Sequence, residues 1–238
     1  MTNVAAPVLE IPSKCRALLL SVLLLVPVSV HGDSVIEGTQ IEEVVREINV
    51  RQKAITSLRA TFKQERSLSL LADLETSSGT FVYAKPNKVV WSYREPKPVT
   101  MLISDGWMTT WYPELRKAEK IEIHRFEDKI FRYMGAVGGA LEDLGRHFDF
   151  RFTDTRSEPS FVLELTPKTR NVERRVRKMT VWIDRETYLT HKFEYVEGDG
   201  DLTRYEFTDI EINPEIDPAT FQLNLPEDVR VEKINLNR

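Results

Sequence analysis

The sequence predicts a mainly β domain with helices, an α+β fold built on a curved antiparallel sheet. From Leu58 onward, apolar and aromatic residues alternate with polar ones at the period-two spacing of β-strands. The intervening segments are short and rich in turn-forming residues, which favours hairpins and therefore antiparallel pairing. No repeat, low-complexity tract or Pro/Ser-rich linker divides the chain. About ten strands then belong to one domain and must curl to hide an apolar face.

The N-terminal residues 1–32 are typical of a secretory signal peptide. Lys14 and Arg16 precede an apolar run at residues 17–26, which is shorter than the roughly 20 apolar residues of a transmembrane span. Small residues follow, and we predict cleavage after Gly32, with cleavage after Ser29 as the alternative. The mature domain is then residues 33–238. An uncleaved anchor helix is the other interpretation of the same run.

Cysteine usage and charge narrow the class of protein further. Cys15 is the only cysteine and lies before the apolar run, whereas the lipidated cysteine of a bacterial lipoprotein follows it. The mature chain is therefore expected to carry neither a lipid anchor nor a disulfide, so that its core alone holds the fold. The formal net charge of −4, with acidic and basic residues interspersed, argues against a nucleic-acid partner.

A helix is predicted at the start of the mature domain. Thr39 and Glu42 have the T-x-x-E spacing of a capping box, which satisfies two free backbone donors at a helix start. Apolar residues then recur at helical spacing and form one stripe: Ile41, Val44, Val45, Ile48 and Ile55. This stripe must pack against an apolar surface.

Two blocks of strands are predicted after the helix. The first contains segments rich in β-branched and aromatic residues, at 60–64, 79–84, 88–93, 99–104 and 109–112. Turn sequences such as Lys85-Pro86-Asn87 separate them. The second block extends from Phe148 to Leu225.

One face of the first block carries the bulkier side chains. Its members are Phe81, Tyr83, Val89, Trp91, Val99, Met101 and Ile103. They alternate along their strands with another set of residues, so they point to the same side of the sheet. Periodicity does not separate a plain β core from a ligand cavity, and both interpretations stay open at this point.

Between the two blocks, residues 130–144 combine an apolar helical face with glycines. The apolar positions are Ile130, Met134, Val137, Leu141 and Leu144. Gly135, Gly138 and Gly139 each cost a helix about 1 kcal/mol relative to alanine. We expect the segment to be either a cover that opens or a core helix whose glycines allow close packing.

The sequence contains no motif that indicates catalysis. A G-x-S-x-G elbow is absent, and the mature chain has only His124, His147 and His191 as candidate bases. Ser104-Asp105-Gly106 lies between two predicted strands, where Asp-Gly is an ordinary hairpin turn. We therefore predict a protein that is not an enzyme and has no catalytic residues.

Metal and headgroup sites are weakly indicated. There is no H-E-x-x-H motif and no cysteine pair, so no metal or other cofactor is predicted. Residues 197–201 cluster three carboxylates that could hold calcium, although Gly-Asp-Gly between strands is primarily a turn. The basic run at 168–178 is either a solvated hairpin loop or a contact for a lipid headgroup or a partner.

A series of short motifs covers nearly all of residues 40–231. They are S-x-x-A-x-F-x-Q at 57–64, Gly79 through Lys85-Pro86-Asn87 to Trp91, Ser104-Asp105-Gly106 with Trp111-Tyr112, L-x-L-x-P-K at 163–168, I-D-P-A-T-F at 216–221 and L-P-E-D-V-R-V at 225–231. In this order they resemble the outer-membrane lipoprotein carrier family (LolA-like). The chain departs from the family pattern at Lys85, where the family has arginine, and at Tyr112 and Pro113, which are adjacent here.

The resemblance implies an unclosed β-barrel whose concave apolar face is covered by helices. It implies a periplasmic, monomeric carrier that takes acylated lipoprotein cargo from an inner-membrane lipoprotein-releasing transporter to an outer-membrane receptor. By the same match, Phe81, Tyr83, Lys85, Val89 and Trp91 point into the concavity. Lys85 would then act as a latch on the cover at 130–144. A lipid- or lipoprotein-sensing protein on the same fold is the alternative, and an esterase is a third hypothesis.

Overall fold

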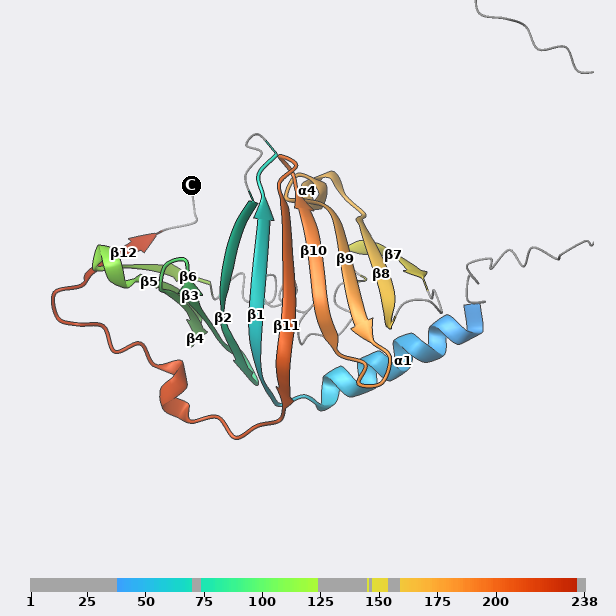
Figure 1. Ribbon diagram of the computed structural model, residues 1–238, viewed down its shortest axis with the longest axis horizontal. Coiled ribbons are helices and arrows are strands. Elements are labelled where there is room, and N and C mark those ends of the chain that lie inside the picture. Colours follow the sequence, from blue (N-terminus) through green and yellow to red (C-terminus); the bar gives the residue numbers. More distant parts are fainter. Residues whose placement is uncertain (1–37, 70–73, 124–144, 146, 154–158, 235–238) are drawn as a thin grey trace, which may run out of the picture. The chain divides into compact units, whose positions relative to one another are not determined.

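The computed structural model describes residues 38–69, 74–123, 145, 147–153 and 159–234. The predicted signal peptide and the predicted cover at 130–144 lie outside these residues. In chain order the elements, with η for 3-10 helices, are α1 (Gly38–Ala54), β1 (Ser57–Ser67), β2 (Leu74–Ala84), β3 (Lys88–Glu95), β4 (Val99–Ser104), β5 (Trp107–Tyr112), η1 (Pro113–Leu115), β6 (Lys117–Glu122), β7 (Phe148–Thr153), β8 (Ser160–Pro167), α4 (Arg170–Glu173), β9 (Val176–Asp184), β10 (Thr190–Glu197), β11 (Leu202–Ile212), η2 (Pro218–Phe221) and β12 (Arg230–Ile234) (Figure 1).

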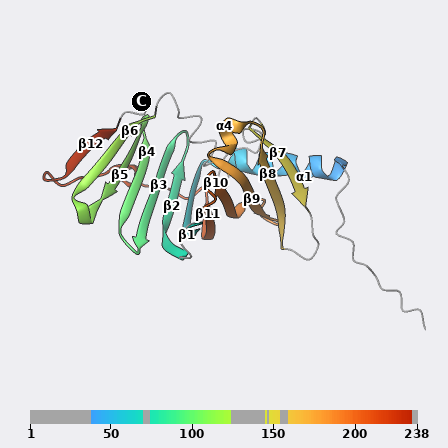
Figure 2. The same cartoon turned by 90° about the horizontal axis from the view of Figure 1, so that it is seen from above.

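The strands form one 12-stranded sheet in the order β12-β6-β5-β4-β3-β2-β1-β11-β10-β9-β8-β7. Two antiparallel meanders, β1 to β6 and β7 to β11, are joined where β1 pairs with β11. The edge strands β12 and β7 lie at opposite ends of the curved sheet and do not meet (Figure 2). The predicted mainly β fold with an unclosed, curved sheet is therefore confirmed.

The last strand departs from the antiparallel pattern. β12 runs parallel to β6, with Arg230 opposite Lys117 and Ile234 opposite Ile121. Residues 213–229 connect β11 to β12 and carry the chain across the sheet to the far side of β6. Hairpin turns alone could not predict this strand, because its partner is more than a hundred residues away in sequence.

One face of the sheet, called the inner face below, carries the main core. Phe62 of β1, Trp91 of β3, Leu163 of β8 and Val181 of β9 all belong to this buried cluster. Alternation along the strands brings these side chains to one side, and their burial removes apolar surface from water. The core therefore extends over both meanders.

The helix α1 packs against the inner face. Ile48 and Ile55 are buried in the same cluster and Val44 is partly buried against it, as the predicted apolar stripe requires. The helix begins at Gly38, so Thr39 lies inside it and the predicted N-cap position is wrong. Ile55 follows Ala54, the last residue of the helix, and still packs in the core.

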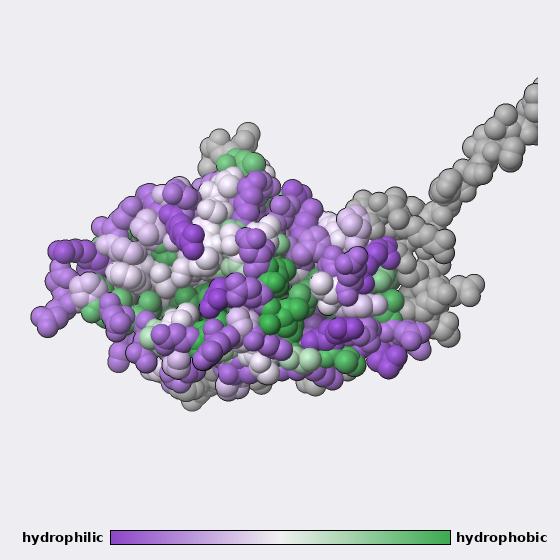
Figure 3. All heavy atoms as spheres, turned by 60° about the horizontal axis from the view of Figure 1, so that its bottom comes forward, coloured by the Kyte–Doolittle hydropathy of each residue, from purple (hydrophilic) through white to green (hydrophobic). Residues whose placement is uncertain are grey.

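The opposite, outer face carries a smaller cluster. Val82, Val90 and Leu102 are buried there with Phe221 of η2, and Ile216 and Leu223 pack around them. The segment between β11 and β12 thus covers part of the outer face of β2, β3 and β4. Figure 3 shows a largely hydrophilic surface on the side it displays, with apolar side chains gathered near the middle.

Candidate functional site

The predicted apolar residues of the first block lie in rows across the inner face. Phe81, Trp91 and Met101 are opposite one another on β2, β3 and β4. Val89 is the centre of a second row, with Tyr83 on β2 and Ile103 on β4 as its register partners. All of these residues belong to the main cluster or pack against it, whereas the half-buried Val99 does not.

Aromatic rings from distant strands meet at Trp91. Its ring centroid lies 4.9 Å from that of Phe62 and 4.6 Å from that of Phe81. The ring of Tyr205 on β11 lies 5.3 Å from Trp91, and Phe193 on β10 stacks on Tyr205 at 4.9 Å. These separations are in the range in which aromatic pairs attract beyond their burial. The rings form one continuous, largely buried aromatic cluster across β10, β11, β1, β2 and β3.

Sequence reasoning did not select several members of this aromatic cluster. Phe62, Tyr93, Phe193, Tyr205 and Phe207 all contribute rings to it. Period-two alternation could have assigned each to a strand face. The pairing that joins the two meanders, with Phe62 opposite Phe207, was needed to bring them together.

The polar atoms within this aromatic cluster are uncharged. Trp91 is 5% exposed, and its Nε1–H has no hydrogen-bond partner among the described residues. The hydroxyl groups of Tyr93 and Tyr205 lie 3.4 Å apart. Burial raises the pKa values of both Tyr93 and Tyr205 above the ordinary value of a tyrosine, so both phenols stay protonated at neutral pH. The aromatic cluster therefore contains uncharged polar groups in an apolar environment.

Hydrogen bonds attach the end of α1 to the sheet. Lys85 Nζ donates to the carbonyl oxygen of Lys53 at 2.6 Å, and Asn213 Nδ2 donates to that of Ala54 at 3.3 Å. A cation and an amide thus satisfy free carbonyls at the helix C-terminus, where positive charge is favourable.

The placement of Lys85 differs from the sequence expectation. Its side chain is exposed and contacts the helix end, instead of pointing into the apolar concavity. Burying an ammonium group without partners is costly, whereas this position leaves it hydrated. The acceptors expected in residues 130–144 lie outside the described residues.

A serine–histidine contact occurs on β8 and β10, but its geometry does not suit a nucleophile. Ser160 Oγ lies 2.7 Å from His191 Nε2, and Asp184 is the register partner of Ser160. Ser160 is only 2% exposed, so a substrate carbonyl has no access to its oxygen. Among the described residues no hydrogen bond joins His191 to Asp184, whose Oδ1 instead accepts from the backbone and side chain of Thr187.

Among the carboxylates at 197–201, that of Asp201 binds residues at the end of β1. Asp201 Oδ1 accepts from the backbone nitrogen of Ser69 at 2.9 Å, and its Oδ2 accepts from Arg66 at 3.0 Å. Within the part of the chain that the structure describes, no group of three or more His, Cys, Asp or Glu side chains could hold a metal ion. In the same part, no helix is long and apolar enough to cross a membrane.

The family of this chain follows from its match to the model of a known protein family. The model of the family described as outer membrane lipoprotein carrier protein LolA matches residues 53–224. The chain belongs to the LolA family. The matched range includes β1 to β11, and therefore the whole aromatic cluster of the inner face.

Individual members of the LolA family are distant from this chain in sequence. The outer-membrane lipoprotein carrier protein of Nitrosomonas europaea is 26% identical over 197 residues, which cover 77% of this chain and 91% of that protein. The protein of the same name from Alkalilimnicola ehrlichii is 28% identical over 174 residues, or 73% and 76% of the two chains. An uncharacterized conserved protein from Thermus thermophilus has a similar fold, with a TM-score of 0.53 and 9% identity over 82% of this chain and 99% of that one.

Proposed function

We propose that this LolA-family protein is a periplasmic carrier that holds the acyl chains of lipoproteins against its inner face. The observation that carries the proposal is the continuous aromatic cluster around Trp91, which joins both meanders. The relatives support the proposal, because they are named outer-membrane lipoprotein carrier proteins. The carrier would receive cargo from an inner-membrane transporter and pass it to an outer-membrane receptor, acting as a monomer exported by cleavage of residues 1–32.

In this proposal the ligand-binding residues are the predicted inner set. Phe81, Trp91 and Met101 form the row nearest the aromatic rings of β1 and β11, and Tyr83, Val89 and Ile103 form the next. Val99 would contact a chain at the margin of this set, since it lies outside the core cluster. The Trp91 indole N–H is the donor available to an ester or amide carbonyl at the head of a chain.

The free energy gained by burying acyl chains is large enough that a carrier needs a way to release its cargo. Burying one methylene is worth about 0.8 kcal/mol, so a chain of about fifteen methylenes offers roughly 12 kcal/mol before costs. A net value of that size already corresponds to a nanomolar dissociation constant, and several chains would bind almost irreversibly. A carrier must therefore offset part of this gain.

A removable cover would provide that offset. We assign this role to residues 130–144 through Ile130, Met134, Val137, Leu141 and Leu144, together with α1, whose Ile48 packs on the inner face. Lys85 would act as a latch, because its bond to Lys53 holds the end of α1 at the sheet. Replacing Lys85 by leucine should alter the rate at which a labelled lipopeptide dissociates, while Lys85→Arg should preserve the rate.

No enzymatic step is part of the proposed function. The serine–histidine contact of the described residues has a buried serine, and the polar groups near Trp91 are neutral phenols and an indole. None of these groups is an activated nucleophile. The cargo would leave with its acyl chains intact.

Binding of an acylated and a deacylated form of one lipopeptide tests the proposal. We expect the acylated form alone to bind. Met101→Gln places a polar amide on the inner face and should weaken binding about tenfold. Thr100→Gln is the matched control, because Thr100 is the neighbouring residue on the other face of β4 and should leave affinity unchanged. Equal binding of both peptides would refute the proposal.

A further inference from the structure

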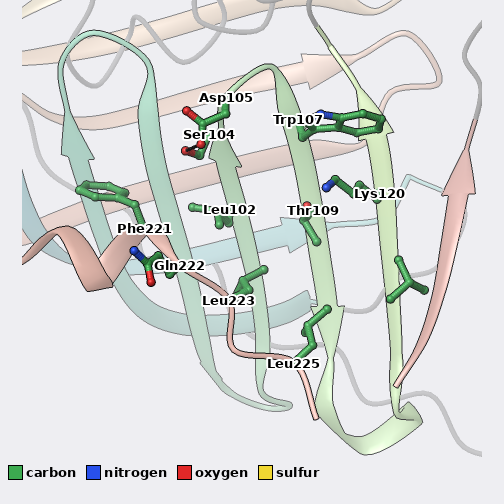
Figure 4. Close-up of a pocket in the computed structure, with 11 residues that line it drawn as sticks. Leu102, Ser104, Asp105, Trp107, Thr109, Lys120, Phe221, Gln222, Leu223 and Leu225 are labelled. Carbon is green, nitrogen blue, oxygen red and sulfur yellow. Dashed lines mark hydrogen bonds between the residues drawn. The ribbon is translucent and has the colours of Figure 1, made fainter. Parts of the chain in front are cut away.

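A pocket of about 360 Å³ lies on the outer face of the sheet, away from the aromatic cluster. It is open to solvent and is lined by β4, β5 and β6 on one side and by η2 and the segment after it on the other (Figure 4). Leu102 of its wall points to the opposite side from its strand neighbours Met101 and Ile103. The volume is within the range of small-molecule sites. This pocket is therefore separate from the proposed acyl-binding face.

The two ends of the pocket differ in chemistry. Ser104, Asp105 and Trp107 lie together at one end, whereas Leu223 and Leu225 lie toward the other (Figure 4). Ser104 Oγ donates to Asp105 Oδ2 at 2.8 Å, so this carboxylate already has a local partner. A ligand that fills the pocket must combine a polar group with a short apolar part.

Two lysine ammonium groups lie near the Trp107 indole, one from the pocket lining (Lys120) and one from β12 beside it (Lys233). Lys120 Nζ lies 4.6 Å from the centre of the Trp107 ring, and Lys233 Nζ lies 5.9 Å from the same centre. The two lysines are register partners on β6 and β12. The C-terminal strand thus brings a second positive charge to this ring.

These two ammonium groups are not neutralised within the described residues. Neither Lys120 nor Lys233 forms an ion pair there, although Glu122 is the register partner of Trp107. Other cations of this sheet end are paired: Lys117 lies 2.7 Å from Glu119 and 3.0 Å from Glu232. An anion bound near both ammonium groups would neutralise positive charge that the described residues leave without an ion pair.

We propose that this outer pocket binds a small amphipathic anion. Its carboxylate or phosphate would lie between Lys120 and Lys233 above Trp107, with ammonium groups donating to the anionic oxygens. Its short hydrocarbon part would extend toward Leu223 and Leu225. The segment between η2 and β12 forms one wall of the site, so occupancy would also hold β12 on the sheet.

Indole N–H signals in NMR spectra test the proposal on the intact mature chain. Octanoate and octyl phosphate are the two probes, and they separate a carboxylate from a phosphate as the preferred headgroup. We expect at least one probe to shift the Trp107 signal saturably, with the signal assigned from Trp107→Phe. A chain bound on the inner face would move the Trp91 signal instead. If neither probe moves Trp107 saturably, the proposal is wrong.

Substitutions then locate the anion and the chain. Replacing both Lys120 and Lys233 by glutamine should weaken the Trp107 response about tenfold, since each contact with a partly exposed charge contributes modestly. Lys97→Gln, in the exposed turn between β3 and β4, removes the same kind of charge and should have no effect. Thr109→Phe fills the pocket from β5 and should abolish the response. Wild-type affinity in the double lysine variant would overturn the proposal even if Thr109→Phe failed to fold.

Discussion

The ring of Trp91 meets the ring of Phe62 nearly edge-on, with centroids 4.9 Å apart and planes at 71°. Trp91 reaches β1 across the intervening strand β2, because Gly79 of β2 lies opposite Phe62 and presents no side chain. This contact ties β3 to the strand that joins the two meanders. Fluorescence from Trp91 should therefore report events over the whole inner face.

We predict that a fatty-acyl probe changes the emission of Trp91. A chain entering the aromatic cluster replaces the surroundings of the indole, and indole emission depends on them. Trp91→Phe should remove most of the signal and keep binding nearly intact, since the apolar ring remains. Trp182→Phe is the control. The Trp182 ring centre lies 4.3 Å from the Lys192 ammonium group, and its strand neighbours Val181 and Ile183 point to the inner face, so Trp182 points to the outer face. An unchanged spectrum at saturating probe would count against the inner site.

Gly79→Ala should destabilise the fold by about 3 kcal/mol, measured by urea unfolding. A Cβ at this position would lie 2.0 Å from the backbone oxygen of Ser92 and 2.9 Å from the ring of Phe62. The backbone oxygen cannot move without disturbing the pairing of β2 with β3. Ser78→Ala, at the preceding residue, should cost far less, and similar losses for the two variants would disprove this explanation.

Asn213 should be the most sensitive residue of the junction between α1 and the sheet. Its Oδ1 accepts from the backbone nitrogen of Thr56 at 2.7 Å, and its φ of 53° is in the left-handed region. Asn213→Ala loses the side-chain bonds and strains the backbone, so we expect a loss of about 2 kcal/mol. Asn213→Gly keeps the backbone relaxed and should lose less. Equal unfolding midpoints for wild type and Asn213→Ala would show that the junction is unimportant.

The fold was predictable from local pattern where neighbouring strands are joined by short turns. The hairpin of β2 and β3 around Lys85-Pro86-Asn87 is such a case, and its inner residues were assigned correctly to one face. The pairing of β1 with β11 was not predictable, because it joins segments about 140 residues apart and depends on long-range packing. The aromatic cluster depends on that pairing, so its members Phe193, Tyr205 and Phe207 were missed.

The contacts of Lys85 and Ser160 were also not predictable from the sequence. The resemblance to the family implied an inward lysine at position 85, but the course of α1 places a carbonyl oxygen at its ammonium group. Ser160 and His191 are 31 residues apart and match no motif, and the bulge between Thr190 and Lys192 lies at His191. A bulge re-aims a side chain, and sequence patterns rarely reveal one.

The free energy of unfolding should decrease as the pH falls below neutral, because His191 is protonated more readily in the unfolded chain. Desolvation lowers the pKa of His191 from its ordinary value, opposed by the carboxylate of Asp184. The unfolded chain then binds a proton near its ordinary pKa of about 6.5 while the folded chain does not, so stability is lost as pH falls through that value. We expect His191→Gln to reduce the difference in urea midpoint between pH 7.5 and pH 5.5. An unchanged difference in the His191→Gln variant would contradict this explanation.

The molecule carried by the protein in cells is the most direct test of the account. The mature protein should be isolated from the periplasmic fraction and examined intact by native mass spectrometry. We predict the mature chain in complex with acylated lipoproteins, with a smaller fraction of the chain in that complex for Met101→Gln than for Thr100→Gln. Recovery of the chain with phospholipid alone, or with no acylated molecule, would contradict the proposed carriage of lipoproteins.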